Sequence, residues 1–102
     1  MIPQFDIRKT DGAYHIELDL PGCRKEELQL RMEGEKLTVR REKKNENVQY
    51  DRVEWSAVEF EKTFSLDEKI DTHSIAAEFE NGVLRLTLPM KEQSQPFTIS
   101  IN

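Results

Sequence analysis

Cys23, His15 and His73 are the residues whose chemistry could support catalysis or metal binding. A thiolate at Cys23 beside an imidazole base would make a nucleophilic pair, and the same three side chains are common zinc ligands. However, Cys23 falls in a turn-like segment, and neither histidine occurs in a nucleophile-elbow or helical context. The separations, 8 residues from 15 to 23 and 50 from 23 to 73, form no local zinc pair. We therefore predict no enzyme active site and no metal site, with both histidines at the surface.

Phosphate-binding loops need glycines that have no other role, and every glycine here is explained by a turn. The four turn pairs are Asp11-Gly12, Pro21-Gly22, Glu33-Gly34 and Asn81-Gly82. The last is the strongest hairpin signal, because both positions of a type I′ turn require positive φ. The chain also lacks a Gly-x-x-x-x-Gly-Lys segment. We expect no nucleotide cofactor and no cofactor of another kind.

The stretch from Arg40 to Lys44 is the most basic in the chain and the one candidate for a nucleic-acid surface. Glu42 interrupts it and Glu46 follows it, while the whole chain has a net charge of -5. A surface that follows a phosphate backbone needs clustered cationic side chains. We interpret the stretch as the solvated end of a strand and expect no nucleic-acid partner.

Membrane and secretion signals are missing from the sequence. No apolar run reaches the ~18 residues of a membrane-spanning helix, and the first five residues lack a basic segment followed by an apolar one. The single cysteine cannot form an intramolecular disulfide, which agrees with a reducing compartment. We expect a soluble cytoplasmic protein without a membrane partner.

Apolar residues recur with a period of two, the spacing that places alternate side chains on one face of a β-strand. The alternating segments are Phe5/Ile7, Tyr14 to Leu20, Leu28 to Met32, Leu37/Val39, Phe60 to Leu66, Ile75 to Phe79 and Leu84 to Leu88. The connectors Cys23 to Glu27 and Asp67 to Ser74 are too short for stable helices, and Asp71 is suited to cap one turn. With 36% hydrophobic and 34% charged residues, the chain can bury one thin core. We predict one all-β domain of seven half-buried strands, arranged as a sandwich.

A polar region over residues 43–57 interrupts this pattern. It is long for a hairpin connection, yet Val48, Tyr50, Val53 and Trp55 within it favour β structure. We predict a projecting strand over residues 48–55 that pairs outside its own sheet.

The end of the chain is a polar linker followed by a last alternating segment. Residues 91–96 show no periodicity, whereas Phe97, Ile99 and Ile101 alternate with polar residues. An exposed tail with three large apolar side chains needs an apolar groove to receive them. We predict that this tail docks on its own domain or on a neighbouring one.

Three motifs resemble those of the α-crystallin domain of small heat-shock proteins, and they occur in the family's order. Leu18-Asp19-Leu20-Pro21-Gly22, followed by Glu26, Glu27 and Leu28, is similar to the family's Leu-Pro-Gly turn. Ala77, Asn81, Gly82, Val83 and Leu84 match its Ala-x-x-x-Asn-Gly-Val-Leu signature. Ile99-Ser100-Ile101 resembles its C-terminal Ile-x-Ile motif, so that the resemblance spans residues 3–102.

The resemblance implies a fold and a function. The fold is an immunoglobulin-like β-sandwich at residues 1–89, with residues 44–57 as a projecting dimerisation loop and strand and residues 90–102 as a C-terminal extension. The function is that of an ATP-independent holdase chaperone of the stress response, and not of an enzyme. Its partners are partly unfolded client proteins and further copies of itself, as a homodimer and, in a full-length form, a higher oligomer. Relatives have a variable N-terminal region, and we expect that such an arm has been cut away here.

The resemblance also implies where these contacts lie. The exchanged dimerisation strand comprises Val48, Gln49, Tyr50, Asp51, Arg52, Val53, Glu54 and Trp55, and the expected ion pairs of the dimer involve Arg40, Arg41, Asp51 and Glu54. The groove for tails and clients lies between two edge strands and is lined by Leu28, Leu30, Met32, Ile75, Ala77 and Phe79. Ile99 and Ile101 of the tail bind in it.

Other interpretations are open at this point. The six groove residues also fit an ordinary core, and residues 48–55 also fit a flexible acidic loop. A CS-domain co-chaperone adaptor shares the sandwich, although it would not be expected to have the Ile-x-Ile tail or the long exchanged strand. A structural assembly module without client binding is a third function class. Protection of a heat-stressed client without ATP would separate these classes.

Overall fold

The computed structural model describes residues 3–46, 54–92 and 96–102, with only the backbone at 44–46 and 54–56. These ranges contain seven strands: β1 (Phe5–Lys9), β2 (Ala13–Asp19), β3 (Leu28–Glu33), β4 (Lys36–Glu46), β5 (Glu54–Ser65), β6 (Ala76–Glu80) and β7 (Val83–Pro89). Two 3₁₀ turns, η1 (Lys25–Glu27) and η2 (Thr72–Ser74), occupy the two short connectors. Asp71 caps η2 by accepting a hydrogen bond from the backbone N–H of His73. The all-β prediction is confirmed.

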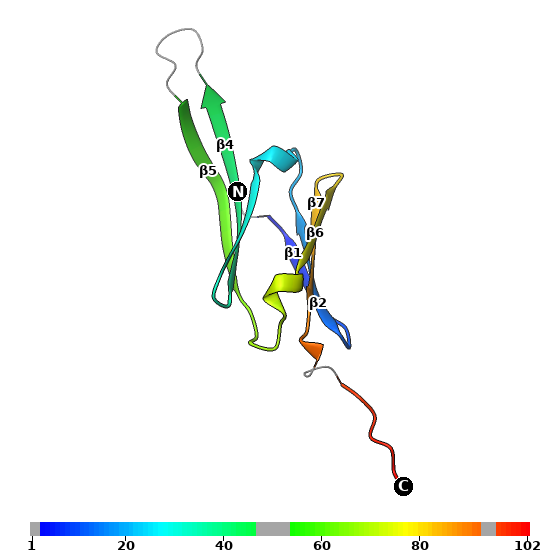
Figure 1. The fold of residues 1–102 in the computed structure, drawn as a ribbon. Helices are drawn as coiled ribbons and strands as arrows, with labels where there is room; N and C mark the ends of the chain where they lie inside the picture. The colour runs from blue at the N-terminus through cyan, green and yellow to red at the C-terminus, as the bar shows by residue number, and fades with distance from the viewer. Residues whose placement is uncertain (1–2, 47–53, 93–95) are drawn as a thin grey trace.

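The strands form two antiparallel sheets that face each other (Figure 1). One sheet has the order β1-β2-β7-β6, and the other has the order β3-β4-β5. The chain changes sheet between β2 and β3, through η1, and between β5 and β6, through η2. Each sheet therefore ends in two edge strands, β1 and β6 in the first and β3 and β5 in the second.

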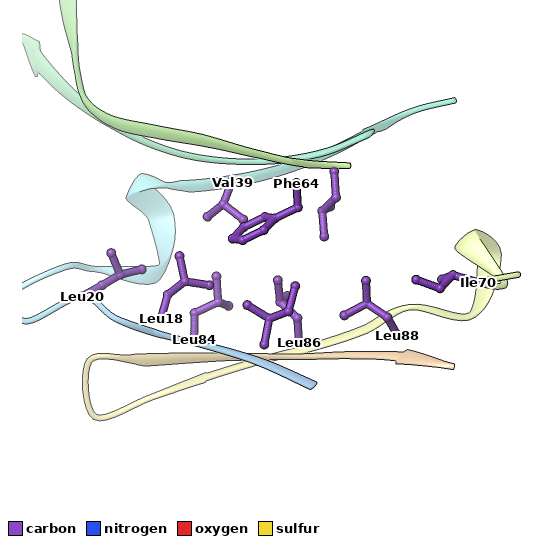
Figure 2. Close-up of a cluster of buried hydrophobic side chains, with 10 residues drawn as sticks. Leu18, Leu20, Val39, Phe64, Ile70, Leu84, Leu86 and Leu88 are labelled. Carbon is purple, nitrogen blue, oxygen red and sulfur yellow. The ribbon is translucent and has the colours of Figure 1, made fainter. Parts of the chain in front are cut away.

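The core lies between the inner faces of the two sheets, where the alternating apolar residues meet (Figure 2). Leu18 pairs with Leu84 and Ile16 with Leu86 across β2 and β7. The buried apolar residues are Ile16, Leu18, Leu20, Leu37, Val39, Phe64, Ile70, Leu84, Leu86, Leu88 and Met90. Each large aliphatic side chain stabilises the fold by about 1.5–3 kcal/mol when it leaves water. The period-two segments thus supply the core.

The aromatic residues show which edge strands lie on the same side of the sandwich. The Phe5 ring of β1 packs edge-to-face on the Phe64 ring of β5, with 5.7 Å between the ring centroids. Since β1 and β5 meet, the remaining edges, β6 and β3, share the opposite side. We call these the β1/β5 side and the β3/β6 side.

The expectation of half-burial does not hold for β1. All five of its residues are exposed, including Phe5 at 46% and Ile7 at 49%. The reason is its position, because an edge strand is covered by neighbours along one side only. Alternation in the sequence predicts the strand but not its place in the sheet.

Candidate functional site

The six predicted groove residues lie on or next to the two edge strands of the β3/β6 side. On β3, Leu28, Leu30 and Met32 pair with Arg41, Val39 and Leu37 of β4. On β6, Ala77 and Phe79 pair with Leu86 and Leu84 of β7, and Ile75 immediately precedes the strand. Residues opposite each other on neighbouring strands point to the same face of a sheet. Because Val39, Leu37, Leu84 and Leu86 are core residues, all five strand residues have the inward phase.

These residues are apolar, and they are partly exposed because they lie on edge strands. Leu28, Met32, Ile75 and Phe79 are partly buried and pack against the core. Leu30 is 40% exposed although its neighbour Val39 is fully buried. Inward-pointing apolar rows on two facing edges make a surface that can bury more apolar area when a third segment lies between them.

The tail is the candidate for that third segment. Phe97, Ile99 and Ile101 are 80%, 75% and 97% exposed, and residues 96–102 form no strand. The tail continues from the last fixed contacts of the sandwich, where Ile70 bridges to Met90 and the Lys91 N–H donates to the Lys69 carbonyl at 2.7 Å. In this single chain the alternating tail and the β3/β6 side are both partly uncovered.

The predicted dimerisation strand lies only partly within the described residues. Val48, Gln49, Tyr50, Asp51, Arg52 and Val53 lie outside them. Glu54 and Trp55 begin β5, and their backbones are in register with Glu46 and Asn45 of β4. Beyond the sandwich, β4 and β5 continue together as a paired projection (Figure 1), and we call residues 42–46 and 54–58 the arm.

The β1/β5 side holds an apolar cavity that sequence reasoning did not identify. It has a volume of about 260 Å³, and its lining includes Ile7, Tyr14, Phe64, Leu66 and Ile70. The alternation at Phe5 and Ile7 was the available signal, but it indicated only a strand. The facing of β1 and β5, which forms the cavity, depends on contacts distant in sequence.

Comparison with known proteins identifies the family. The Hsp20/alpha crystallin family model matches residues 6–102. The chain belongs to this family. The Hsp20/alpha crystallin resemblance inferred from three short motifs is thereby confirmed, and membership supports a chaperone role and not an enzymatic one.

Relatives of this Hsp20 chain agree in sequence and in fold. Spore protein SP21 of Stigmatella aurantiaca is 34% identical over 104 residues, which cover 98% of this chain and 62% of that protein. Small heat shock protein C2 of Rickettsia felis is 34% identical, with 99% of this chain and 68% of that protein covered. The structure of heat shock protein 16.0 from Schizosaccharomyces pombe has a TM-score of 0.72 and 32% identity, covering 100% of this chain and 99% of that one. This chain thus spans about two thirds of the length of the first two relatives.

Two of the Hsp20 sequence motifs contact each other in the fold. Asn81 and Gly82 form the two-residue turn between β6 and β7, with φ of 53° and 78°. The Gly82 carbonyl accepts a hydrogen bond from the Leu20 N–H at 2.7 Å. A Cβ at Gly82 would lie 3.4 Å from the Leu20 carbonyl oxygen and would need a strained φ. The signature hairpin is therefore fixed against the Leu-Pro-Gly turn, which keeps β6 at its edge position.

The two candidate arginines both have carboxylate partners within the chain. Arg40 lies 3.4 Å from Glu42 and 3.8 Å from Glu61. Arg41 lies 3.6 Å from Glu27 and 3.3 Å from Glu59. Their expected partners in the dimer were Asp51, which lies outside the described residues, and Glu54, of which only the backbone is described.

The interpretation of residues 40–44 as a solvated strand end is wrong for Arg41. Its side chain is only 12% exposed, whereas Lys43 is exposed. Arg41 has the inward phase of Leu37 and Val39 on β4, which the run of charges in the sequence concealed. It is therefore a charged residue at the margin of the core.

The residues with potential for thiol or metal chemistry do not form a site. Cys23 is partly buried, its thiol donates to the Arg24 carbonyl at 3.4 Å, and burial raises the pKa of that thiol. His15 Nε2 lies 3.2 Å from the Thr10 hydroxyl on the first sheet, and His73 is exposed in η2. The described part of the chain has no cluster of side chains suited to a metal ion. Nor does it have a helix able to cross a membrane.

Proposed function

We propose that this protein is an ATP-independent holdase of the cytoplasm, which binds partly unfolded proteins and limits their aggregation. Residues 1–89 are the α-crystallin domain, with the segment at 44–57 as its dimerisation element, and residues 90–102 are the C-terminal extension. The β3/β6 side takes the Ile99-Ser100-Ile101 segment of a tail in the resting assembly. A client takes the same apolar rows when the tail leaves.

The observation that supports this proposal most is that one chain has two exposed apolar surfaces, one on the β3/β6 side and one on the tail. Leu30 on β3 is 40% exposed, and Ile99 and Ile101 on the tail are 75% and 97% exposed. Alternate tail residues match the two-residue period of the edge strands, so that an extended tail can present both isoleucines to one surface.

The energetics favour an exchangeable contact rather than a permanent one. Two buried isoleucines gain about 1.5–3 kcal/mol each, whereas ordering an extended segment costs about 1–2 kcal/mol for every residue fixed. One tail therefore binds weakly, and several tails on one assembly bind well because each works at a high local concentration. Clients and tails exchange one hydrophobic contact for another, which requires no nucleotide.

Besides the contact between tail and groove, copies of the chain associate through the arm as dimers. A strand added to a sheet edge supplies backbone hydrogen bonds and covers an edge that would otherwise pair without control. The exposed β1 edge is available to accept a strand. Deletion of residues 46–55 is expected to give a monomer in sedimentation velocity, and a persistent dimer would rule out the exchanged strand.

The test of the function is aggregation of a heat-sensitive client, followed by light scattering without ATP. Wild type is expected to suppress scattering, and the Ile99→Ala/Ile101→Ala double variant is expected to lose assembly mass and to change its client protection. The matched control is Thr98→Ala/Ser100→Ala, which alters the alternate positions of the same tail. Equal mass for all three proteins would remove the tail from assembly. No suppression by wild type would leave an adaptor or a structural module as the better function.

A further inference from the structure

Arg41 lies where the arm leaves the sandwich. The inward-facing residues of β4 run Leu37, Val39, Arg41, so that the arginine takes the last core position before the arm. Such a position would normally hold an apolar residue, because a charge that leaves water costs free energy unless it is paired. Arg41 must therefore be considered together with its partners.

Three residues from two segments of the chain contact the Arg41 guanidinium. Its Nη2 atom donates to the Gly22 carbonyl at 3.3 Å and lies 3.6 Å from Glu27 Oε1, both on the connection between the two sheets. Its Nε atom lies 3.3 Å from Glu59 Oε2 on β5. Glu27 is itself buried, at 8% exposure, and is held in place by a 2.8 Å hydrogen bond from the Arg24 N–H.

Glu59 is the extra residue of a β-bulge. Arg41 pairs with Phe60, but the next residue, Glu42, pairs with Val58, so that the register shifts by one residue at this point. A bulge bends its strand and increases the local twist. The register shift that starts the arm therefore includes the residue that Arg41 contacts.

We propose that Arg41 is a positioning residue that sets the angle between the arm and the sandwich, by joining the bulged Glu59 to the Gly22–Glu27 connection. The inference rests on the proposed function in that the arm leads into residues 48–55, the strand proposed to pair with a second copy of this chain. A fixed angle lowers the entropy lost when the arm meets its partner. Arg41 thereby favours dimerisation without touching the partner.

Arg40 provides the matched control, because it is the same residue type one position earlier. It faces outward, is 38% exposed, and contacts Glu42 and Glu61, neither of which is the bulged residue. The pair with Glu61 is largely exposed and contributes little, whereas Glu42 is only 14% exposed. Arg41→Met and Arg40→Met therefore remove equal charge and equal length from opposite faces of β4.

The experiment follows the arm angle through the distance between two spin labels, one on the arm and one on the sandwich. Labels at Glu46→Cys on the arm and Glu80→Cys on β6 are introduced into a Cys23→Ser background, and labelled chains are diluted into excess unlabelled protein. In Arg41→Met we expect the distance distribution to become roughly twice as wide and the dimer dissociation constant to rise about tenfold, as loss of a partly buried contact predicts. In Arg40→Met both changes should be clearly smaller, because Arg40 does not contact the bulged residue.

Every outcome decides the question. An unchanged width in folded Arg41→Met, or an equal change in Arg40→Met, overturns the inference. If Arg41→Met does not fold, Glu59→Gln serves instead, since Glu59 is 39% exposed and its loss leaves the pair between Arg41 and Glu27 intact. If the width of the distance distribution is also unchanged in Glu59→Gln, the inference is overturned.

The inference and the proposed function fail separately. A narrow distribution in a wild type that never dimerises would preserve the role of Arg41 in setting the angle and would refute assembly through the arm. If wild type dimerises and protects clients, but the spin-label distance distribution is the same in Arg41→Met, the role of Arg41 is refuted and assembly through the arm is preserved.

Discussion

The two sides of the sandwich both expose apolar residues, but they differ in the contacts that join the two sheets. On the β1/β5 side, the Phe5 and Phe64 rings meet edge-to-face, and Lys62 Nζ lies 5.4 Å and 5.8 Å from their centroids. On the β3/β6 side, no ring contact or cation–π contact among the described residues joins the sheets. Aliphatic residues such as Leu30 remain partly uncovered there.

From this difference we expect the β1/β5 side to stabilise the fold and the β3/β6 side to bind segments that can be exchanged. Aromatic pairs prefer defined geometries, whereas aliphatic rows can accept any apolar segment that lies along them. We therefore expect substitutions on the β1/β5 side to act mainly on stability. Substitutions on the β3/β6 side should act mainly on tail and client binding.

Phe64→Ala is the strongest way to break the comparison. Phe64 is 7% exposed and takes part in both the core and the edge-to-face pair, so its truncation is expected to cost about 3–5 kcal/mol of unfolding free energy. Urea denaturation measures this directly. Phe97→Ala makes the same change at a tail residue that is 80% exposed, and its unfolding free energy should match that of wild type. A loss below about 1 kcal/mol in Phe64→Ala would show that the aromatic pair does not hold this side closed.

Acid should weaken the β3/β6 side, because Glu27 precedes β3 directly. The hydrogen bond from the Arg24 N–H lowers the pKa of Glu27 below its ordinary value of 4.5, with help from the Arg41 charge and against the effect of burial. A lowered folded-state pKa gives stability that is complete above the ordinary pKa and is lost as the pH falls through the lowered one. Unfolding free energy should therefore decline in that window, and Glu27→Gln should flatten the decline.

The control for the acid effect is Glu26→Gln, one residue earlier in η1 and exposed. It should keep the full pH dependence of wild type. Equal slopes for Glu27→Gln and wild type would show that the ionised Glu27 carboxylate does not stabilise the fold.

Leu30→Ala sharpens the comparison through binding rather than stability. Because Leu30 is 40% exposed, the truncation should cost about 1 kcal/mol or less of unfolding free energy. Client protection measured by light scattering should nevertheless fall. Ile7→Ala is the matched control, since Ile7 is 49% exposed on the other side. If both variants protect the client equally well, the β3/β6 side is not the binding surface.

Lys62→Met is expected to have the smallest effect. Its ammonium lies over two rings at a partly exposed position, where a cation–π contact contributes about 0.5–1 kcal/mol. Methionine keeps most of the side-chain volume and removes the charge. Thermal unfolding compared with Lys36→Met, an exposed lysine on β4, measures the difference. Identical melting temperatures would assign no role to the cation.

Local patterns were sufficient to predict that the strands exist, but not that β4 extends to Glu46 and pairs there with a β5 that begins at Glu54. Leu84, Leu86 and Leu88 alternate and are buried, and Asn81-Gly82 marks a turn because positive φ is needed at both positions. These signals are contained within a few neighbouring residues. For the same reason the two 3₁₀ turns and the cap at Asp71 were predictable.

Features that depend on contacts between sheets were not predictable. The sequence around Arg41 resembles a solvated end, and nothing in it indicates that Glu59 occupies a bulge opposite this residue. Phe5 alternates as regularly as core residues do, yet β1 is an edge. The six residues of the β3/β6 side were located through family resemblance, because periodicity alone cannot distinguish an inward residue of an edge strand from one of a central strand.

The exposed β1 strand also bears on how this protein avoids becoming an aggregate itself. An unpaired edge with alternating apolar residues is a template for fibril-like stacking of identical chains. In β1 the positions between and after Phe5 and Ile7 are Asp6, Arg8 and Lys9, all exposed. These charges act as gatekeepers, since like charges would face one another in a stack of identical strands in register. The charges on β1 thus oppose stacking of its exposed edge on copies of itself.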